Sequence, residues 1–339
     1  MTSGKKRVVG FGELLLRLTP PGRRLIAQTQ SFDVEVGGAA ANVVAGLSSL
    51  GHETKMISRV ADNPLGRLAV GTLAARGVNT GHISYAPGRM GLYFLEQGQG
   101  LRASAINYDR AGSAFALSQP RDFDFAAALD GASLLHLSGI TPALGPESSE
   151  SALDVVRIAR KKGVQVSFDG NFRPQLWGAW DSNPKAILTE LVANADVLFG
   201  NHKDISLLTG EAFDGDGTDR RRKAAEVGFQ AFPNLKMIAS TARHVIDVDH
   251  HRLAARVDLP DDFAETKDVD VTGIVDRIGT GDAFAAGVLH SMLEGADIQS
   301  TARSGLGLAV LEHSLPGDMP LFTRDDLAAF ETGGFDVRR

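Results

Sequence analysis

The sequence contains no cysteine, which excludes disulfide bonds, thiolate metal sites and a cysteine nucleophile, and is typical of a reducing compartment. It has no apolar run long enough to cross a membrane. It also lacks an excess of basic residues: the formal net charge is −6, so we expect no nucleic-acid partner. Only three residues are tyrosines, so a segment that holds two of them stands out.

The N-terminal segment lacks the apolar core of a signal peptide, which together with the missing cysteine predicts a soluble, cytoplasmic protein. The 339 residues, 43% of them hydrophobic, are enough for one large domain over residues 1–339. Residues 220–223 form the one dense basic run, which we interpret as a solvated helix face. His250 and His251 lack a third ligand at useful spacing, so we expect a solvated loop pair and not a metal site.

From about residue 132 onward, short apolar runs alternate with helical segments. The runs are residues 134–137, 164–168, 197–199 and 237–239. This alternation predicts a mostly parallel sheet that is covered by helices on both faces. In such sheets ligands bind beyond the carboxyl ends of the strands, where this chain carries the polar clusters 169–174, 201–204 and 240–243. No dinucleotide fingerprint or P-loop pattern follows any of these runs.

A second, smaller sheet is predicted from two segments of about residues 12–36 and 88–110. Both contain short runs with the alternation of a sheet that has one wet face, and the second reads as a hairpin. Tyr93 and Tyr108 fall on this hairpin, close to Arg110. Aromatic rings beside an arginine suit a lid over a polar ligand, although they also suit a sheet face made of ordinary β-formers.

The stretch from 275 to 284 contains a glycine turn that opens a helix. Gly279 and Gly281 flank Thr280, so backbone N–H groups can approach an anion where the helix dipole also favours negative charge. Asp282 follows at the mouth of this turn, and we expect its carboxylate to stay ionised and to accept a proton from an attacking hydroxyl. The alternative is that Asp282 caps a helix and the glycines make a plain turn.

Two motifs near opposite ends of the chain resemble those of the ribokinase-like (PfkB) carbohydrate kinases. Residues 276–282 read Asp-Arg-Ile-Gly-Thr-Gly-Asp, similar to the family's C-terminal signature, whose last aspartate is the catalytic base. Residues 37–42 read Gly-Gly-Ala-Ala-Ala-Asn, similar to its N-terminal glycine-pair signature. The resemblance implies a three-layer α/β/α fold in which the small sheet is a lid, with Asp282 as base and residues 279–281 as the anion hole. Taken alone, the glycine pair could be a plain strand–helix turn, and Asn42 could bind a hydroxyl or cap locally.

Further segments resemble the 2-keto-3-deoxygluconate kinase branch of this family. They are residues 12–22, 108–114, 171–177, 238–243 and 313–318. By that resemblance one group of residues binds the sugar acid: Gly37, Gly38, Asn42, Tyr93, Tyr108, Arg110, Arg173 and Asp318. A second group faces the nucleotide: Asn171, Asn201, Ser240, Thr241 and Arg243. Arginines suit an acidic sugar, because their fork of N–H donors matches a carboxylate or a phosphate.

The expected reaction is transfer of the γ-phosphoryl group of ATP to 2-keto-3-deoxygluconate, giving the 6-phosphate, with Mg²⁺ as cofactor. Asp204 stands where the family's Asn-x-x-Glu motif has glutamate, so it is expected to act on the metal through water. A fructokinase or another PfkB-type sugar kinase is the alternative within the family. A non-catalytic sugar or nucleotide sensor is the alternative outside it, and the intact Asp282 and glycines argue against it. A monovalent cation and a homodimer formed through the lid sheet are also expected.

Overall fold

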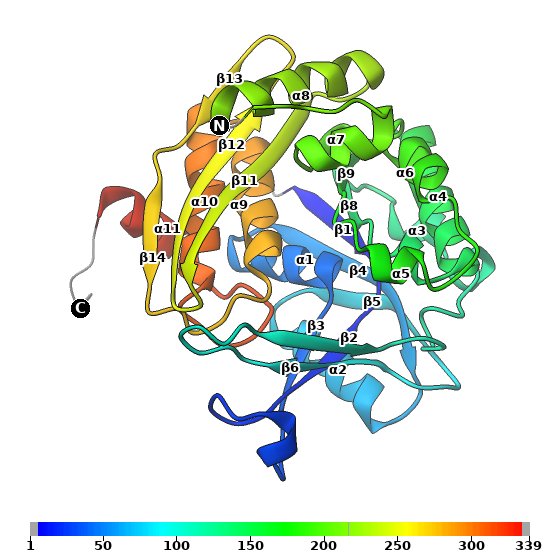
Figure 1. Ribbon diagram of the computed structural model, residues 1–339. Helices are drawn as coiled ribbons and strands as arrows, with labels where there is room; N and C mark the ends of the chain where they lie inside the picture. Colours follow the sequence, from blue (N-terminus) through cyan, green and yellow to red (C-terminus); the bar gives the residue numbers. More distant parts are fainter. Residues whose placement is uncertain (1–5, 216, 334–339) are drawn as a thin grey trace.

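The middle strands of the central sheet, β1 and β8 to β10, have side chains that are buried on both faces. The computed structural model describes residues 6–215 and 217–333, and Figure 1 shows helices on both sides of this sheet. Its strands are β1 (Arg7–Phe11), β4 (Glu53–Ala61), β5 (Asn79–Ala86), β8 (Leu134–Ser138), β9 (Gln165–Asp169), β10 (Val197–Phe199), β11 (Met237–Asp247), β12 (His250–Asp258), β13 (Phe263–Glu265) and β14 (Val269–Thr272).

The strand order is β13–β12–β11–β10–β9–β8–β1–β4–β5, and β14 also pairs with β12. Pairs from β5 to β11 are parallel, whereas β12 pairs antiparallel with β11, β13 and β14. The four apolar runs predicted as strands are β8 to β11, although the last run is only the start of an eleven-residue strand. The predicted mostly parallel sheet is therefore confirmed.

Neighbouring residues on one strand enter different cores, which explains why these strands are continuously apolar. Val8 and Leu134 join one hydrophobic cluster, whereas Val9 and Leu135 join the other. The first cluster is covered by α1 (Ala39–Ser49), α2 (Pro64–Ala75), α9 (Thr280–Glu294), α10 (Ile298–Glu312) and α11 (Arg324–Thr332). The second is covered by α3 (Phe125–Ala128), α4 (Pro146–Lys161), α5 (Pro174–Trp177), α6 (Pro184–Val192), α7 (His202–Thr209) and α8 (Gly217–Ala231). Single 3₁₀ turns occur at η1 (Ile26–Gln28), η2 (Pro120–Asp122) and η3 (Pro142–Leu144).

The small sheet forms a separate layer beneath the main body in Figure 1. It contains β2 (Leu15–Thr19), β3 (Asp33–Gly37), β6 (Gly91–Glu96) and β7 (Ala105–Asp109), in the order β3–β2–β6–β7. The β6–β7 hairpin and the β2–β3 pair are antiparallel, and β2 joins β6 in parallel. The three-layer fold with a small additional sheet, predicted from the family resemblance, is thus confirmed.

Two surface assignments made from the sequence were wrong. In the basic run on α8, Arg221 forms an ion pair with Glu265, and Arg222 donates to the carbonyl of Leu259 at 3.0 Å. Both arginines are half-buried, because α8 lies against the antiparallel edge of the sheet. His251 is fully buried on β12, with its ring edge-on to that of His313.

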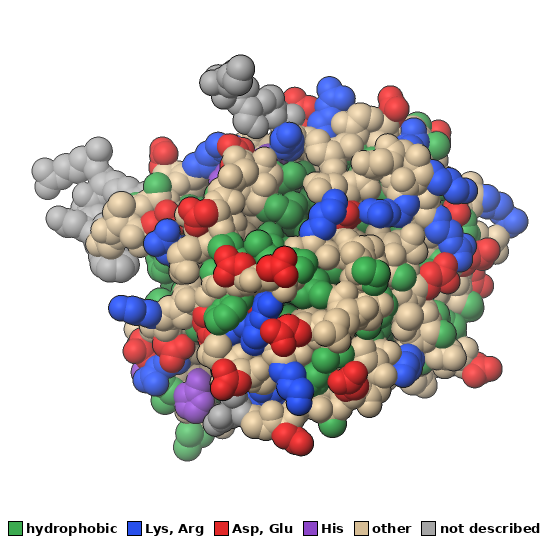
Figure 2. All heavy atoms as spheres, turned by 90° about the horizontal axis from the view of Figure 1, so that it is seen from above, with side chains coloured by type: hydrophobic (Ala, Val, Ile, Leu, Met, Phe, Trp, Pro, Cys, Tyr) green, Lys and Arg blue, Asp and Glu red, His purple; other side chains and the backbone are tan. Residues whose placement is uncertain are grey.

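Two features bear on membrane and surface properties, namely the apolar length of the helices and the distribution of charged side chains. Within residues 6–215 and 217–333, no helix is both long and apolar enough to span a membrane. Figure 2 shows acidic and basic side chains interspersed over the face that is seen from above, with hydrophobic side chains between them. This face therefore carries no broad field of one sign.

Candidate active site

A cavity of about 1110 Å³ lies between the small sheet and the carboxyl ends of the parallel strands. Asp169 at the end of β9, Asn201 after β10 and residues 239–243 of β11 form one part of its wall. The first turns of α1 and α9 form another part, and Leu15, Tyr93 and Tyr108 of the small sheet face them. The strand-end rule thus located the polar clusters correctly, because the ends of parallel strands meet at one edge.

Most of the residues singled out in the sequence meet in this cavity. Those that line it are Gly38, Asn42, Tyr93, Tyr108, Arg110, Arg173, Asp318, Asn171, Asn201, Ser240, Thr241, Arg243, Asp204, Gly279, Thr280, Gly281 and Asp282. Gly37 does not line it. A Cβ atom at Gly37 would lie 2.1 Å from Oδ2 of Asp318, so this glycine makes room for that carboxylate.

The glycine turn before α9 has a backbone that only glycine adopts easily. Gly279 is the N-cap residue with φ +79°, and a Cβ atom there would lie 2.2 Å from the carbonyl oxygen of Asp318. Thr280 donates its hydroxyl to the carbonyl of Arg277 at 3.0 Å, which holds the turn closed. A Cβ atom at Gly281 would meet no atom within 4 Å, so the cavity stays open in front of this turn. Backbone N–H groups at this helix start are therefore accessible to an anion.

Asp282 lies in the first turn of α9 and contacts α1 through Asn42. The amide Nδ2 of Asn42 donates to Oδ2 of Asp282 at 2.6 Å. Burial raises the pKa of Asp282 to about 8, in opposition to this hydrogen bond. The negative charges of Asp169 and Asp318 raise that pKa further. In the chain without ligands, burial and the neighbouring carboxylates thus oppose the ionisation that is expected of Asp282.

Two more carboxylates line the cavity, Asp169 at the end of β9 and Asp204 in the first turn of α7. Asp204 accepts the backbone N–H of Asn201 at 2.8 Å and so caps α7. Burial raises the pKa of Asp204, and burial together with the charge of Asp204 raises the pKa of Asp169 to about 7. Neighbouring carboxylates and the amide oxygens of Asn171 and Asn201 are the hard oxygen ligands that Mg²⁺ prefers, so these residues fit a magnesium ion.

Basic side chains gather on the same side of the cavity. Lys203, Arg220, Arg221, Arg243 and Arg277 all line it. Burial lowers the pKa of Arg243, and the positive charge of Arg277 adds to this effect. Such a cluster of positive charge suits a polyphosphate.

The backbone of Asn171 belongs to the same wall and is strained. Asn171 has φ +37°, in the left-handed region, and its Nδ2 donates to the hydroxyl of Ser138 at 3.2 Å. A left-handed residue other than glycine is uncommon and tends to occur at functional sites.

On the small-sheet side, a buried ion cluster is formed around Arg17. Its guanidinium lies 2.7 Å from the carboxylate of Asp276 and 3.0 Å from that of Asp318. Tyr93 donates its hydroxyl to Asp318 at 2.6 Å. Burial raises the pKa of Asp318 to about 6, although Arg17 and this hydrogen bond oppose the rise. Asp318 is thereby held by two strands of the small sheet, β2 and β6, and lines the cavity.

Arg110 is also part of a buried ion pair, with Glu13. Its Nε and Nη2 donate to Oε2 of Glu13, whose other oxygen accepts the hydroxyl of Ser113. The guanidinium lies 5.8 Å from the ring centre of Tyr108. Arg110 is only 7% exposed, and it lines the cavity.

Several residues of the site were missed in the sequence. Asp169 was part of a polar cluster that the strand-end rule marked, but no role was assigned to it. Glu13 and Arg17 were visible as charges within an apolar run, which is a usable signal for buried ion pairs. Arg221 was taken for a surface residue, since helix periodicity alone cannot show that a sheet edge lies beside it.

Comparison with known proteins places this geometry in a family. The model of the pfkB family carbohydrate kinases matches residues 5–320. The chain belongs to the PfkB family of carbohydrate kinases. The family and fold predicted from the two glycine motifs are confirmed, and as a PfkB kinase the chain is an ATP-dependent carbohydrate kinase.

Individual PfkB relatives resemble the chain over almost its full length. It is 29% identical over 329 residues to a 2-dehydro-3-deoxygalactonokinase of Haloferax volcanii, covering 96% of this chain and 97% of the relative. It is 28% identical over 332 residues to a 2-dehydro-3-deoxygluconokinase of Bacillus subtilis, covering 96% and 95%. The crystal structure of a 2-dehydro-3-deoxygluconokinase of Thermotoga maritima matches with a TM-score of 0.92 at 36% identity, covering 97% of this chain and 100% of that one.

Proposed function

We propose that this PfkB kinase phosphorylates a 2-keto-3-deoxy sugar acid, with 2-keto-3-deoxygluconate as the main substrate. The observation that carries the proposal is that Arg110 and Arg173, from separate segments, line the cavity that contains Asp282. An acidic sugar between them would find a guanidinium on either side. Relatives named for the gluconate and galactonate forms of this substrate, also written 2-dehydro-3-deoxy, support the same class.

In this proposal, Asp282 accepts the proton of the substrate's primary hydroxyl while the hydroxyl oxygen attacks the γ-phosphorus of ATP. The bond to the ADP oxygen breaks, and the N–H groups of the turn at Gly279–Gly281 hold the transferred phosphoryl group. Asn42 fixes the carboxylate of Asp282 through their 2.6 Å hydrogen bond. Asp169 and Asp204 would hold Mg²⁺, partly through water, and the bound ion would neutralise phosphate charge.

Two roles remain to be assigned on the nucleotide and substrate walls. We assign Asn171, Asn201, Ser240, Thr241 and Arg243 to ATP, because they line the strand-end wall where the basic side chains gather. We assign Gly38, Tyr93, Tyr108 and Asp318 to the sugar, because they line the opposite part of the cavity. Gly37 acts indirectly by making room for Asp318.

A fructokinase is the second candidate within the family, and a panel of substrates separates the two. Initial rates are measured by coupled ADP detection with 2-keto-3-deoxygluconate, 2-keto-3-deoxygalactonate, fructose and ribose. We expect kcat/KM for a keto-deoxy acid to exceed that for fructose by more than about tenfold, because a charge-assisted hydrogen bond contributes about 1.5–3 kcal/mol. An equal or higher value for fructose would favour the fructokinase, and no turnover of any sugar would favour a sensor.

The small sheet is also the proposed dimer interface. Val34 of β3 is a large apolar side chain that is 46% exposed, on the face of this sheet that points away from the cavity. Sedimentation velocity should give a dimer, which Val34→Asp weakens; a wild-type monomer would refute this. We further propose a cytoplasmic location, where ATP is supplied. We also propose that a monovalent cation activates the enzyme. Replacing K⁺ by tetramethylammonium in the rate assay would test this activation.

A further inference from the structure

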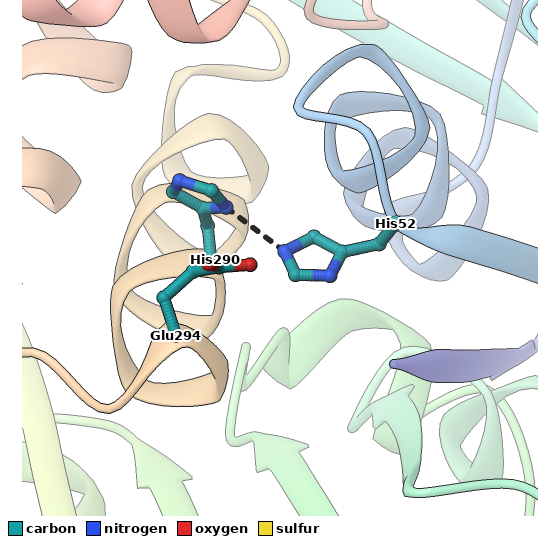
Figure 3. A group of neighbouring side chains, drawn as sticks. All are labelled: His52, His290 and Glu294. Atoms are coloured by element: carbon teal, nitrogen blue, oxygen red, sulfur yellow. Dashed lines mark hydrogen bonds between the residues drawn. The ribbon is translucent and has the colours of Figure 1, made fainter. Parts of the chain in front are cut away.

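Three potential metal ligands meet at the ends of α1 and α9, away from the cavity. His52 follows Gly51, which closes α1, and His290 and Glu294 lie one turn apart near the end of α9. One ligand atom from each of the three lies within 4.8 Å of the others. Figure 3 shows His290 and Glu294 projecting from α9 toward the ring of His52. Residues four apart on a helix share one face, which explains this convergence.

The burial and the donor atoms of these groups suit a metal ion. The rings of His52 and His290 are only 6% and 9% exposed, and Glu294 adds a carboxylate at the rim of the cluster. Two imidazoles and one carboxylate are a typical ligand set for a divalent transition metal.

We propose that His52, His290 and Glu294 bind one divalent first-row transition metal ion such as Zn²⁺ or Ni²⁺. Nε2 of His52 lies 2.8 Å from Nδ1 of His290. Two nitrogens bound to one such ion lie about 2.9 Å apart at a right angle and about 3.3 Å apart at the tetrahedral angle. Either ion thus fits after a small opening of the rings.

The carboxylate of Glu294 is shared in this site. Arg324 donates to its Oε1 at 2.9 Å and also to the carbonyl of Leu50 at 2.6 Å. A carboxylate has two oxygens, so it can serve the arginine and a metal ion together. Mg²⁺ prefers oxygen ligands and holds its water tightly, so it should not compete for this histidine pair.

The metal would join two helices whose opposite ends form the active site. Asn42 on α1 and Asp282 on α9 are hydrogen-bonded at those ends. The helices also touch between the two sites, since a Cβ atom at Gly46 would lie 3.0 Å from that of Ala286. His290 is eight residues from Asp282, about 12 Å along the helix axis, so the ion would stabilise the pair of helices without touching the substrate.

The test is metal binding by the full chain after chelator treatment, without nucleotide and with excess MgCl₂ to occupy the oxygen ligands of the cavity. ZnCl₂ and NiCl₂ are titrated by calorimetry, and the melting temperature is followed at each concentration. We expect one high-affinity equivalent and a rise in melting temperature, because an ion that binds only the folded chain stabilises it. His290→Gln should lose this response, and Glu294→Gln should weaken binding by about tenfold or more.

His82→Gln is the matched control, since it removes a histidine of β5 outside the cluster and should bind as the wild type does. Glu294→Gln keeps both histidines and changes only an exposed ion pair, so it decides the question if His290→Gln does not fold. The proposal would be overturned if neither ZnCl₂ nor NiCl₂ changed the melting temperature of the wild type. So would wild-type affinity in Glu294→Gln, or an affinity that is reduced as much in His82→Gln as in Glu294→Gln.

Discussion

On the small-sheet side of the cavity, buried charges of opposite sign are bound to one another, whereas at the strand ends carboxylates face other carboxylates. Arg17 joins Asp276 and Asp318, and Arg110 joins Glu13. Across the cavity, the charge of Asp204 raises the pKa of Asp169, and that of Asp169 raises the pKa of Asp282. The small-sheet side is organised before a ligand arrives. The carboxylates at the strand ends require a nearby cation to be fully ionised at neutral pH.

The carboxylates at the strand ends make the free energy of unfolding depend on pH. A free aspartate has a pKa of about 3.9, whereas those of Asp169 and Asp282 in the fold are raised to about 7 and about 8. Between about pH 4 and these values, the folded chain binds more protons than the unfolded chain. The contribution of these two groups to stability is thus largest in acid and is lost as the pH rises through 7 and 8. At neutral pH these two carboxylates therefore lower the free energy of unfolding, and in return they form a site that attracts cations.

The strongest test of this comparison is Asp282→Asn. The amide keeps the shape but cannot accept the hydroxyl proton, so we expect kcat to fall by about 10²–10⁴ while ATP still binds. Because the amide also cannot ionise, the variant should melt at or above the wild-type temperature at pH 8, with a smaller difference at pH 5. Steady-state kinetics, ATP calorimetry and melting curves at both pH values measure this. A folded variant with near-normal kcat would remove Asp282 from the mechanism.

Arg110→Ala tests the paired side. It should raise KM for 2-keto-3-deoxygluconate by more than about tenfold and affect fructose much less, because only the acid offers a carboxylate to the guanidinium. It also leaves Glu13 buried without its partner, which should lower the free energy of unfolding by about 3–5 kcal/mol. Kinetics with both sugars and urea unfolding measure the two effects.

A double variant separates binding from stability at this position. In Arg110→Ala with Glu13→Gln, the stranded charge is removed, so most of the stability should return while KM for the acid stays high. If KM recovers with stability, or if both sugars are weakened equally by Arg110→Ala, Arg110 is a structural contact of the lid, and the fructokinase candidate moves ahead.

The local features of this fold could be predicted from the sequence, because periodicity and glycine placement are local. The parallel strands, the helix closed by Gly51 and the helix opened by Gly279 all follow from patterns of a few residues. The strand-end rule also located the polar clusters. The family resemblance, and not spacing alone, supplied the individual residues of the site.

The pairings across the site could not be predicted, because they join distant parts of the chain. Asn42 and Asp282 are 240 residues apart, and Tyr93 and Asp318 are 225 apart. The burial of His251 depends on which elements cover β12. The pKa of Asp282 likewise depends on carboxylates that only the fold brings together.

The smallest expected effect is that of Asp204→Glu, which restores the family residue. In a capping box, glutamate at this helix position bonds back to the N-cap N–H, so α7 and the melting temperature should be preserved. The carboxylate of Asp204 already lies against Gly170, where a Cβ atom would be 2.9 Å from Oδ1. One more methylene therefore moves the charge toward the cavity and should lower the half-saturating Mg²⁺ concentration by less than about tenfold. Asp204→Asn is the matched control, since it keeps the size, removes the charge and should raise that concentration. Magnesium titrations that coincide for both variants and the wild type would place the ion elsewhere, and the like-charged pair of Asp169 and Asp204 would then need another explanation.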